Sequence, residues 1–248
     1  MIKSDFAIVL STKHDLFCII ENVMKKLYKI LAVAVLFFAG SALFSQGITT
    51  ASTYFKTISE YYASLKDYEA DFEIKINKDE YAGKLSYKTP DLLRLDYSNP
   101  KNQVICFNGD MLTIYLPRSN AILQQQITSS GKNAASVATA QGLSLLSRYY
   151  TVAYETGQNA EPLEEGSDEM VIKFVLSRKS TSEAFRYIKI SVNPQTKLIR
   201  RIEATTAKDE NFVFDFYEYK LNQGITDQRF IYDPPSDANN YNNFLFSE

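Results

Sequence analysis

Residues that could carry out catalysis are scarce in this chain. Its single histidine, His14, lies near the N-terminus in a stretch interpreted below as a targeting sequence. The rest of the chain then has no imidazole for a Ser-His or Cys-His pair, and none for a zinc site. No Gly-x-Ser-x-Gly, glycine-rich phosphate loop or Cys-x-x-Cys motif is present. The sequence therefore predicts a protein that is not an enzyme, without catalytic residues, metal or cofactor.

Two groups of potentially reactive side chains have simpler interpretations. The loop at 157–168 is acidic and contains glycine, but its carboxylates lack the ordered spacing of a calcium loop. A solvated hairpin tip is the interpretation that we adopt. The carboxylates concerned are Glu164, Glu165, Asp168 and Glu169. Cys106 stands between Ile105 and Phe107, which predicts a buried thiol on a strand.

Apolar and aromatic side chains are abundant instead. The chain has 17 tyrosines and 16 phenylalanines. Such a composition suits a large apolar guest, because each buried methylene contributes about 0.8 kcal/mol. For any single aromatic residue, packing in the core is the simpler interpretation. After Gln46 there are 22 basic and 26 acidic residues, a net charge of −4, and this argues against nucleic acid as a partner.

The N-terminal segment has the pattern of an export signal. Lys25, Lys26 and Lys29 precede an uncharged apolar run at 30–44, which small and polar residues follow. We interpret residues 1–46 as a signal segment with its true start at Met24, and residues 47–248 as a single domain. An uncleaved anchor is the alternative, although the run is shorter than the ~20 residues of a membrane span.

The remaining chain alternates short apolar runs with turn signals. A helix is predicted at 49–65, where apolar residues recur every three or four positions, and a strand at 68–76, where they alternate. Asn108-Gly109 predicts a hairpin inside a meander at 81–126. Further strands are predicted at 149–155, 170–176, 185–192, 198–206 and 212–221. Ten or eleven antiparallel strands and two helices predict an α+β, mainly β fold in which a curled antiparallel sheet forms an open half-barrel.

The last of these strands is apolar on both faces. Phe212, Phe214 and Phe216 share one face, and we place the other apolar residues on the opposite face. Those residues are Val213, Tyr217, Tyr219 and Leu221. A strand of this kind needs cover on both sides. Residues 239–243 are interpreted as an exposed tail.

The order of elements in the meander resembles the LolA/LolB family of periplasmic lipoprotein carriers. The positions that carry the resemblance are Gly83, Leu85, Lys88, Pro90, Leu93, Pro100, Asn108-Gly109, Tyr115, Pro117 and Gln124-Gln125. Phe230 and Pro234-Pro235 resemble a C-terminal element of the same family. No cysteine lies near the cleavage region, so the chain resembles the soluble carrier rather than the lipidated receptor.

The resemblance implies a half-barrel with an N-terminal helix and a helical lid on its concave side. It implies a soluble periplasmic carrier, acting as a monomer, that binds the acyl chains of lipoproteins in an apolar cavity and moves them from the inner to the outer membrane. Its implied partners are an inner-membrane ABC-type lipoprotein release complex and an outer-membrane acceptor. Two alternatives remain: a carrier or sensor of other lipids or glycolipids, and an enzyme that acts on lipids in the same cavity.

Alternation predicts which side chains line this cavity, with a register uncertain by one in each strand. They are Phe72, Ile74, Leu85, Tyr87, Leu93, Leu95, Leu112 and Ile114. A segment rich in small residues, 128–147, ends in a leucine patch of Leu143, Leu145 and Leu146, at the position of the family's lid. An ordinary crossover helix is the alternative for this segment.

The resemblance also places a lid latch just before Pro90. The family's carriers have an arginine there, whereas this chain has Thr89, which cannot donate a forked set of hydrogen bonds. Lys88 is one residue earlier and is expected to point to the opposite face of its strand. The latch is therefore the feature of the family that this sequence departs from.

Overall fold

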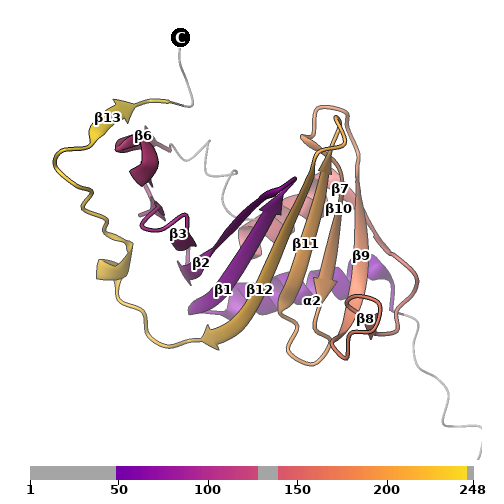
Figure 1. The fold of residues 1–248 in the computed structure, drawn as a ribbon. Helices are drawn as coiled ribbons and strands as arrows, with labels where there is room; N and C mark the ends of the chain where they lie inside the picture. Colours follow the sequence, from indigo (N-terminus) through magenta and orange to yellow (C-terminus); the bar gives the residue numbers. More distant parts are fainter. Residues whose placement is uncertain (1–48, 128–138, 245–248) are drawn as a thin grey trace, which may run out of the picture. The chain divides into compact units, whose positions relative to one another are not determined.

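The computed structural model describes residues 49–127 and 139–244 (Figure 1). Thr49–Glu248 forms one compact unit. The predicted signal segment and most of the predicted lid, 128–138, lie outside the described residues, so both stay predictions.

The described part of the chain contains a single large sheet, one two-stranded branch and two α-helices. The helices are α2 (Ala51–Ser64) and α3 (Ala140–Tyr149), and the 3-10 helices are η1 (Pro117–Ser119) and η3 (Asp227–Phe230). The strands are β1 (Asp67–Ile76), β2 (Asp79–Lys88), β3 (Leu92–Asn99), β4 (Val104–Phe107), β5 (Met111–Leu116), β6 (Ala121–Gln126), β7 (Tyr150–Tyr154), β8 (Glu161–Pro162), β9 (Met170–Arg178), β10 (Phe185–Val192), β11 (Ile199–Thr206), β12 (Asn211–Leu221) and β13 (Asn239–Asn242).

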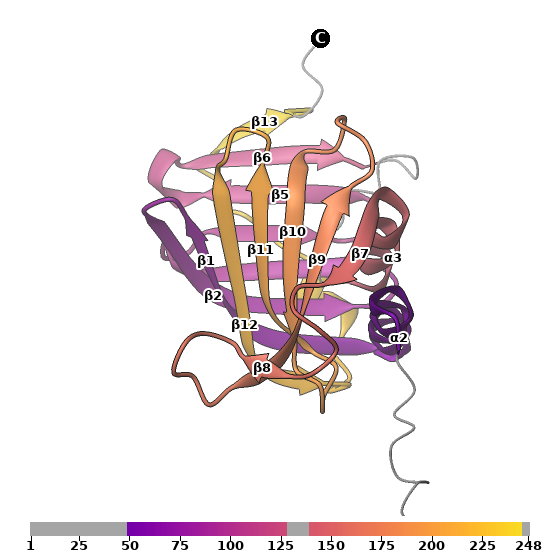
Figure 2. The ribbon, with the colours of Figure 1, turned by 90° about the vertical axis from the view of Figure 1, so that its right-hand side faces the viewer.

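The strand order in the sheet is β13-β6-β5-β4-β3-β2-β1-β12-β11-β10-β9-β7, with β8 paired to β9. Its two end strands, β13 and β7, do not pair with each other, so the barrel stays open. Figure 2 shows β2–β6 crossing behind β9–β12, which is the strong curl expected of a twisted sheet of this size. The predicted α+β half-barrel is confirmed.

Local sequence signals explain several of these elements. The Thr50 hydroxyl caps α2 by accepting a hydrogen bond from the Thr53 N–H at 3.2 Å. In the β4–β5 hairpin, the Asn108 side chain accepts hydrogen bonds from the N–H groups of Asp110 and Met111. Gly109 takes a φ of +98°, which suits a residue without Cβ. The predicted helix and hairpin are therefore confirmed.

The predicted faces of β12 are wrong beyond Tyr217. Two residues of β12, Glu218 and Tyr219, stand opposite the single residue Ala70 of β1, and Glu218 has a φ of +51°. This β-bulge shifts the alternation by one position. Tyr219 and Leu221 consequently lie on the same face as Phe216, while Tyr217 stays on the opposite face as predicted.

Residues 239–242 are exposed as predicted, but they form the edge strand β13 and not a tail. It pairs with β6 in the parallel direction, so the sheet is not entirely antiparallel. The strand count reaches thirteen in the described residues, above the predicted ten or eleven. The two strands that were not predicted are β8 and β13, whose sequences lack the apolar alternation that marks a strand.

Candidate functional site

We call the face of the sheet on which α2 packs the inner face, and the opposite one the outer face. Strand pairing places all eight predicted cavity residues of β1–β5 on the inner face. One row across the strands is Ala70, Leu85, Leu95, Ile105, Ile114 and Leu123. The next row is Tyr68, Tyr87, Leu93, Phe107, Leu112 and Gln125. The predicted register is therefore confirmed. The role of these residues in binding stays a prediction.

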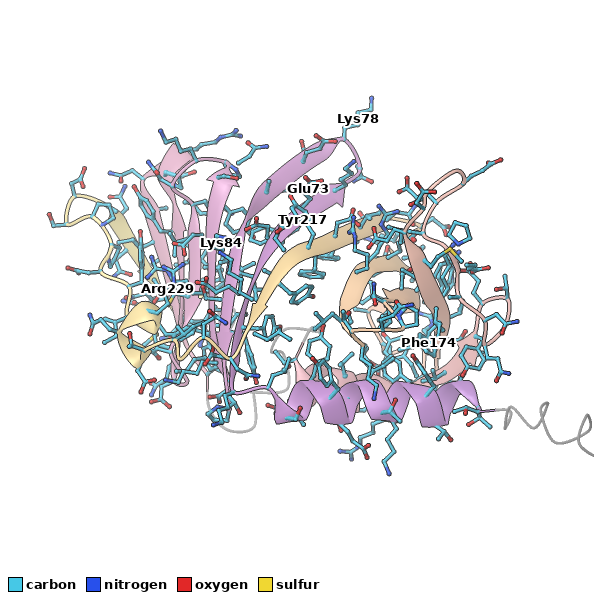
Figure 3. All side chains as sticks on the ribbon, turned by 90° about the horizontal axis from the view of Figure 1, so that it is seen from below. Glu73, Lys78, Lys84, Phe174, Tyr217 and Arg229 are labelled. Atoms are coloured by element: carbon cyan, nitrogen blue, oxygen red, sulfur yellow. The ribbon has the colours of Figure 1, made fainter. Side chains whose placement is uncertain are left out.

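One half of the inner face, from β9 to β12, is covered by the helices. Phe174 of β9 is fully buried, and its ring lies against Tyr54 and Phe55 of α2 at centroid distances of 5.8 and 5.6 Å. Figure 3 shows this side chain within the curled strands, above α2. The Tyr62 hydroxyl of α2 accepts a hydrogen bond from the Ile199 N–H at 2.9 Å. Helix and sheet thus form one main hydrophobic core here.

Most of the predicted cavity residues belong to this main core. Those that are buried in it are Phe72, Ile74, Leu85, Tyr87, Leu143 and Leu146. Leu93 and Leu95 of β3 are half-buried and pack against it, and Leu145 is half-buried. The leucine patch is therefore part of α3, where Leu143 and Leu146 contribute to the packing of the fold.

The other half of the inner face, from β4 to β6, has a different environment. Its inward side chains Ile105, Leu112, Ile114 and Leu123 are half-buried and do not belong to the main core that contains α2 and α3. They lie on adjacent strands, so they form one continuous apolar surface. We call these four residues the open patch.

The inner face of β3–β6 carries no charged side chain at its described strand positions. Its described inward positions are Leu93, Leu95, Tyr97, Ile105, Phe107, Leu112, Ile114, Leu116, Ala121, Leu123 and Gln125. Tyr97 and Gln125 are the polar residues among them. Burial raises the pKa of Tyr97 to about 12, so its hydroxyl is neutral at physiological pH. A surface of this kind attracts apolar groups without directional bonds.

The outer face is charged and is crossed by the C-terminal segment. Lys84 lies 2.8 Å from Asp71, and the Tyr217 hydroxyl donates to Glu73 at 3.0 Å; Figure 3 labels Lys84, Tyr217 and Glu73 on this face. Arg229 of η3 reaches Asp96 from the segment that follows β12. The ionic side chains therefore gather on the face opposite to the open patch.

Two predicted side chains are found on the outer face. The Lys88 ammonium donates to the Ile225 carbonyl at 2.8 Å, which confirms that it points away from the inner face. Cys106 is buried, and its thiol donates to the Phe230 carbonyl at 3.2 Å. Burial raises the pKa of this thiol, so it is the neutral, buried strand cysteine that the sequence predicted.

The latch position and the acidic loop make backbone hydrogen bonds and ion pairs. Thr89 is exposed, and its N–H donates to the Lys66 carbonyl just beyond α2. Most of the predicted lid lies outside the described residues, so a latch at Thr89 stays a prediction. Glu164 and Glu169 pair with Arg201 and Arg200. Within the described ranges, no cluster of three or more His, Cys, Asp or Glu residues could hold a metal ion.

Sequence reasoning missed several inward residues. Ile105 and Phe107 lie in β4, which is apolar at every position and so gives no alternation from which to choose a face. Leu123 follows another apolar residue, Ile122, and the same ambiguity applies. The hairpin at Asn108-Gly109 was the available signal, because it fixes the register between β4 and β5.

The architecture defines an open, curled half-barrel with two helices and an uncharged apolar surface on its inner side. The chain belongs to the LolA family, because the family model described as "Outer membrane lipoprotein carrier protein LolA" matches residues 64–233. In the described ranges, neither helix has the length and apolar character required to cross a bilayer.

Individual relatives are distant. The outer-membrane lipoprotein carrier protein of Pseudomonas aeruginosa PAO1 is 22% identical over 156 residues, which cover 63% of this chain and 69% of the relative. An uncharacterized conserved protein from Thermus thermophilus has a similar fold, with a TM-score of 0.51 and 14% identity over 77% of this chain and 98% of the other. A structure of MucB gives a TM-score of 0.50 and 10% identity, with 74% and 62% covered.

Proposed function

We propose that this protein is a soluble periplasmic carrier that binds the acyl chains of lipoproteins on its inner face and moves them from the inner to the outer membrane. The observation that carries the proposal is the open patch on β4–β6. Four half-buried aliphatic and uncharged side chains lie there on adjacent strands, outside the main core. Binding of this kind needs no catalytic group.

The free energy gained by burying acyl chains on this surface is sufficient for a carrier. An acyl chain that buries ten methylenes would gain about 8 kcal/mol, at about 0.8 kcal/mol for each methylene. That gross value corresponds to about micromolar affinity before the loss of rigid-body freedom is subtracted. Two or three chains bound together compensate for that loss, and a guest held this way can still be released to an acceptor.

The partners of such a carrier are part of the proposal. The printed name of the family, outer membrane lipoprotein carrier protein, supports lipoproteins as the cargo and the outer membrane as the destination. For this chain we propose an inner-membrane ABC-type lipoprotein release complex as the donor and an outer-membrane acceptor as the recipient. The charged outer face and the exposed turns are the parts of the molecule available for protein contacts while the inner face holds the guest.

A carrier or sensor of other lipids or glycolipids is the second candidate. It is favoured by one observation, the absence of charged residues at the described inward positions of β3–β6. None of these side chains would recognise the peptide part of a lipoprotein, so the acyl chains alone would be selected.

Mass spectrometry of the protein purified from the periplasm, under conditions that keep bound lipid in place, tests the proposal. We expect triacylated or diacylated lipoproteins to co-purify in stoichiometric amount. Ile114→Glu, in the open patch, should remove them, while Gln124→Glu on the outer face of β6 serves as the matched control. Co-purified phospholipid or glycolipid would support the second candidate, and an empty wild-type protein that also binds no added lipopeptide would contradict both.

A further inference from the structure

The two halves of the sheet are covered on opposite faces. In β9–β12 the helices pack on the inner face. On the outer face of β4–β6, by contrast, Val104, Cys106 and Ile122 are buried although they do not belong to the main core. The open patch lies on the other side of the same strands. These strands are therefore supported from the face that a guest does not use.

The cover on this outer face is the segment that follows β12, residues 222–242, which we call the strap. Near its start, the Asp67 carboxylate of β1 accepts a hydrogen bond from the Gln223 N–H at 2.7 Å. Near its end, the Asn120 amide, just before β6, donates to the Asp237 carbonyl at 3.0 Å. Figure 1 shows the strap passing along β3 and β6 to β13. It therefore spans the sheet from β1 to its edge.

The middle of the strap is held by packing and by polar contacts. Phe230 is 1% exposed, and its carbonyl accepts the hydrogen bond from the Cys106 thiol. The Tyr232 ring lies 6.3 Å from the Tyr115 ring, and the Arg94 guanidinium lies 5.4 Å from the centroid of the Tyr232 ring. The strands β3, β4 and β5 thus each contact the strap through at least one side chain.

These outer contacts are next to inward apolar residues on the same strands. Arg94 lies between Leu93 and Leu95, and Tyr115 follows Ile114 of the open patch. Neighbouring side chains of a strand point to opposite faces. A movement of the strand backbone on the outer side therefore displaces the inward side chains as well.

The strap ends as the edge strand β13. Its pairing with β6 places Tyr241 opposite Leu123, so Tyr241 points to the inner face beside the open patch. On the outer face, the Asn240 amide donates to the Gln124 side-chain oxygen at 3.0 Å. The strap consequently also holds the strand that borders the open patch.

We propose that the strap is a conformational control of the open patch. While it lies on the outer face it fixes the curvature of β3–β6 and keeps the patch in the shape that binds a guest, and when it lifts the affinity falls because this preorganisation is lost. The inference rests on the proposed function and adds to it a route by which contacts on the outer face change the affinity of the inner face. Because such coupling is reciprocal, a bound guest holds the strap more firmly.

Cys106 is a native reporter of this control, because its thiol is buried under the strap. The rate at which N-ethylmaleimide alkylates Cys106 measures how often the strap lifts. A second cysteine, introduced by Ala204→Cys in the main core, reports unfolding of the other half. Both rates are measured by mass spectrometry, with and without a saturating synthetic diacylated lipopeptide.

We expect the bound lipopeptide to slow alkylation of Cys106 by roughly fivefold or more, and alkylation at position 204 by less than about twofold. Phe230→Ala removes the buried anchor of the strap, so it favours the lifted state and should weaken lipopeptide binding by up to the same factor. Ile231→Ala is the matched control, because this neighbouring side chain is 58% exposed and its loss should change the affinity by less than about twofold.

Alkylation of Cys106 that bound lipopeptide leaves unchanged, or slows only as much as at position 204, overturns the inference and leaves the carrier function standing. So does unchanged lipopeptide affinity in a folded Phe230→Ala variant whose Cys106 reacts faster. If that variant does not fold, the two alkylation rates decide alone. Failure of the lipopeptide to bind the wild-type protein contradicts the proposed function itself.

Discussion

On the half of the sheet formed by β9–β12, the inward side chains are enclosed by α2 and α3, whereas those of β4–β6 form a half-buried patch outside that core. Both halves direct apolar side chains to the inner face, and both belong to one continuous sheet. The difference shows that the sequence can indicate which side chains point inward, but not whether they pack in the core or bind a guest. What packs against the face decides whether a leucine stabilises the fold or remains available to a guest.

The largest expected effect is on the stability of the covered half. Leu176→Ala removes a fully buried side chain of β9 and leaves a cavity in the main core, which should lower the free energy of unfolding by about 2–5 kcal/mol. Leu112→Ala makes the same change in the open patch, where the loss should stay below about 1 kcal/mol because the site is already half-exposed. Urea denaturation of both variants measures the contrast. Equal losses would mean that the two halves are packed alike.

A charge introduced on the inner face should lower acyl-probe affinity and folding stability to different extents in the two halves. Ile114→Glu places a carboxylate in the open patch and should weaken binding of an acyl probe by roughly tenfold or more, since a charge is costly to remove from water. Leu95→Glu should reduce binding as well, but with a larger loss of stability, because Leu95 packs against the main core.

Gln124→Glu is the control for that experiment, because it adds the same charge on the outer face of the neighbouring strand. Probe binding and thermal unfolding are measured side by side. If Ile114→Glu lost stability and affinity in the same proportion as Leu95→Glu, the open patch would be ordinary core.

Alkaline pH should weaken the covered half. Burial raises the pKa of Tyr62 to about 12, and burial also raises the pKa values of Tyr68 and Tyr219. In the unfolded chain a tyrosine titrates near 10, so above that pH unfolding releases protons and stability falls as the pH rises toward 12. Their contribution is fully present below pH about 10.

Urea denaturation between pH 9 and 12 follows this decline. Tyr62→Phe should make the decline shallower, because one titrating group is removed, whereas the tyrosines that remain should keep part of it. An unchanged slope in Tyr62→Phe would show that the hydroxyl ionises as readily in the folded protein as in the unfolded chain.

The smallest expected effect concerns the outer face. Lys84 and Asp71 form an ion pair at 2.8 Å with both side chains partly exposed, and such pairs contribute about 0–1 kcal/mol. Lys84→Ala should therefore change the unfolding free energy by less than about 1 kcal/mol and leave the acyl-probe affinity unchanged. A clear loss of affinity would extend the binding site to the outer face.

Local signals were sufficient for much of the fold. The amide side chains of Asn108 and Asn193 accept hydrogen bonds from the backbone two and three residues ahead, so both turns were readable from the sequence. The alternation from Tyr68 to Ile76 gave the inner face of β1, and pairing carried that face across to β5. The eight residues predicted for β1–β5 lie on the inner face, as expected, while their part in binding stays a prediction.

Features that depend on contacts between distant parts of the chain could not be predicted from the sequence. The bulge at Glu218 depends on how β12 pairs with β1, about 150 residues earlier in the chain, and its sequence has no glycine to mark it. The strand β13 has the sequence Asn-Asn-Tyr-Asn, with little strand propensity. It is held in place by contacts upstream of it, including Arg94 to the Arg229 carbonyl and Asn120 to the Asp237 carbonyl. Tyr241 therefore reached the inner face without a local signal.

The most direct test of the account is to map where an acyl chain lies. A lipopeptide with a diazirine at the end of one acyl chain is bound to the protein, irradiated and digested, and the labelled peptides are identified by mass spectrometry. We predict labels within 92–126, on the inward residues of β3–β6. Labels confined to 170–216, or labelling equal to that of heat-denatured protein, would contradict the claim that the open half of the inner face binds the guest.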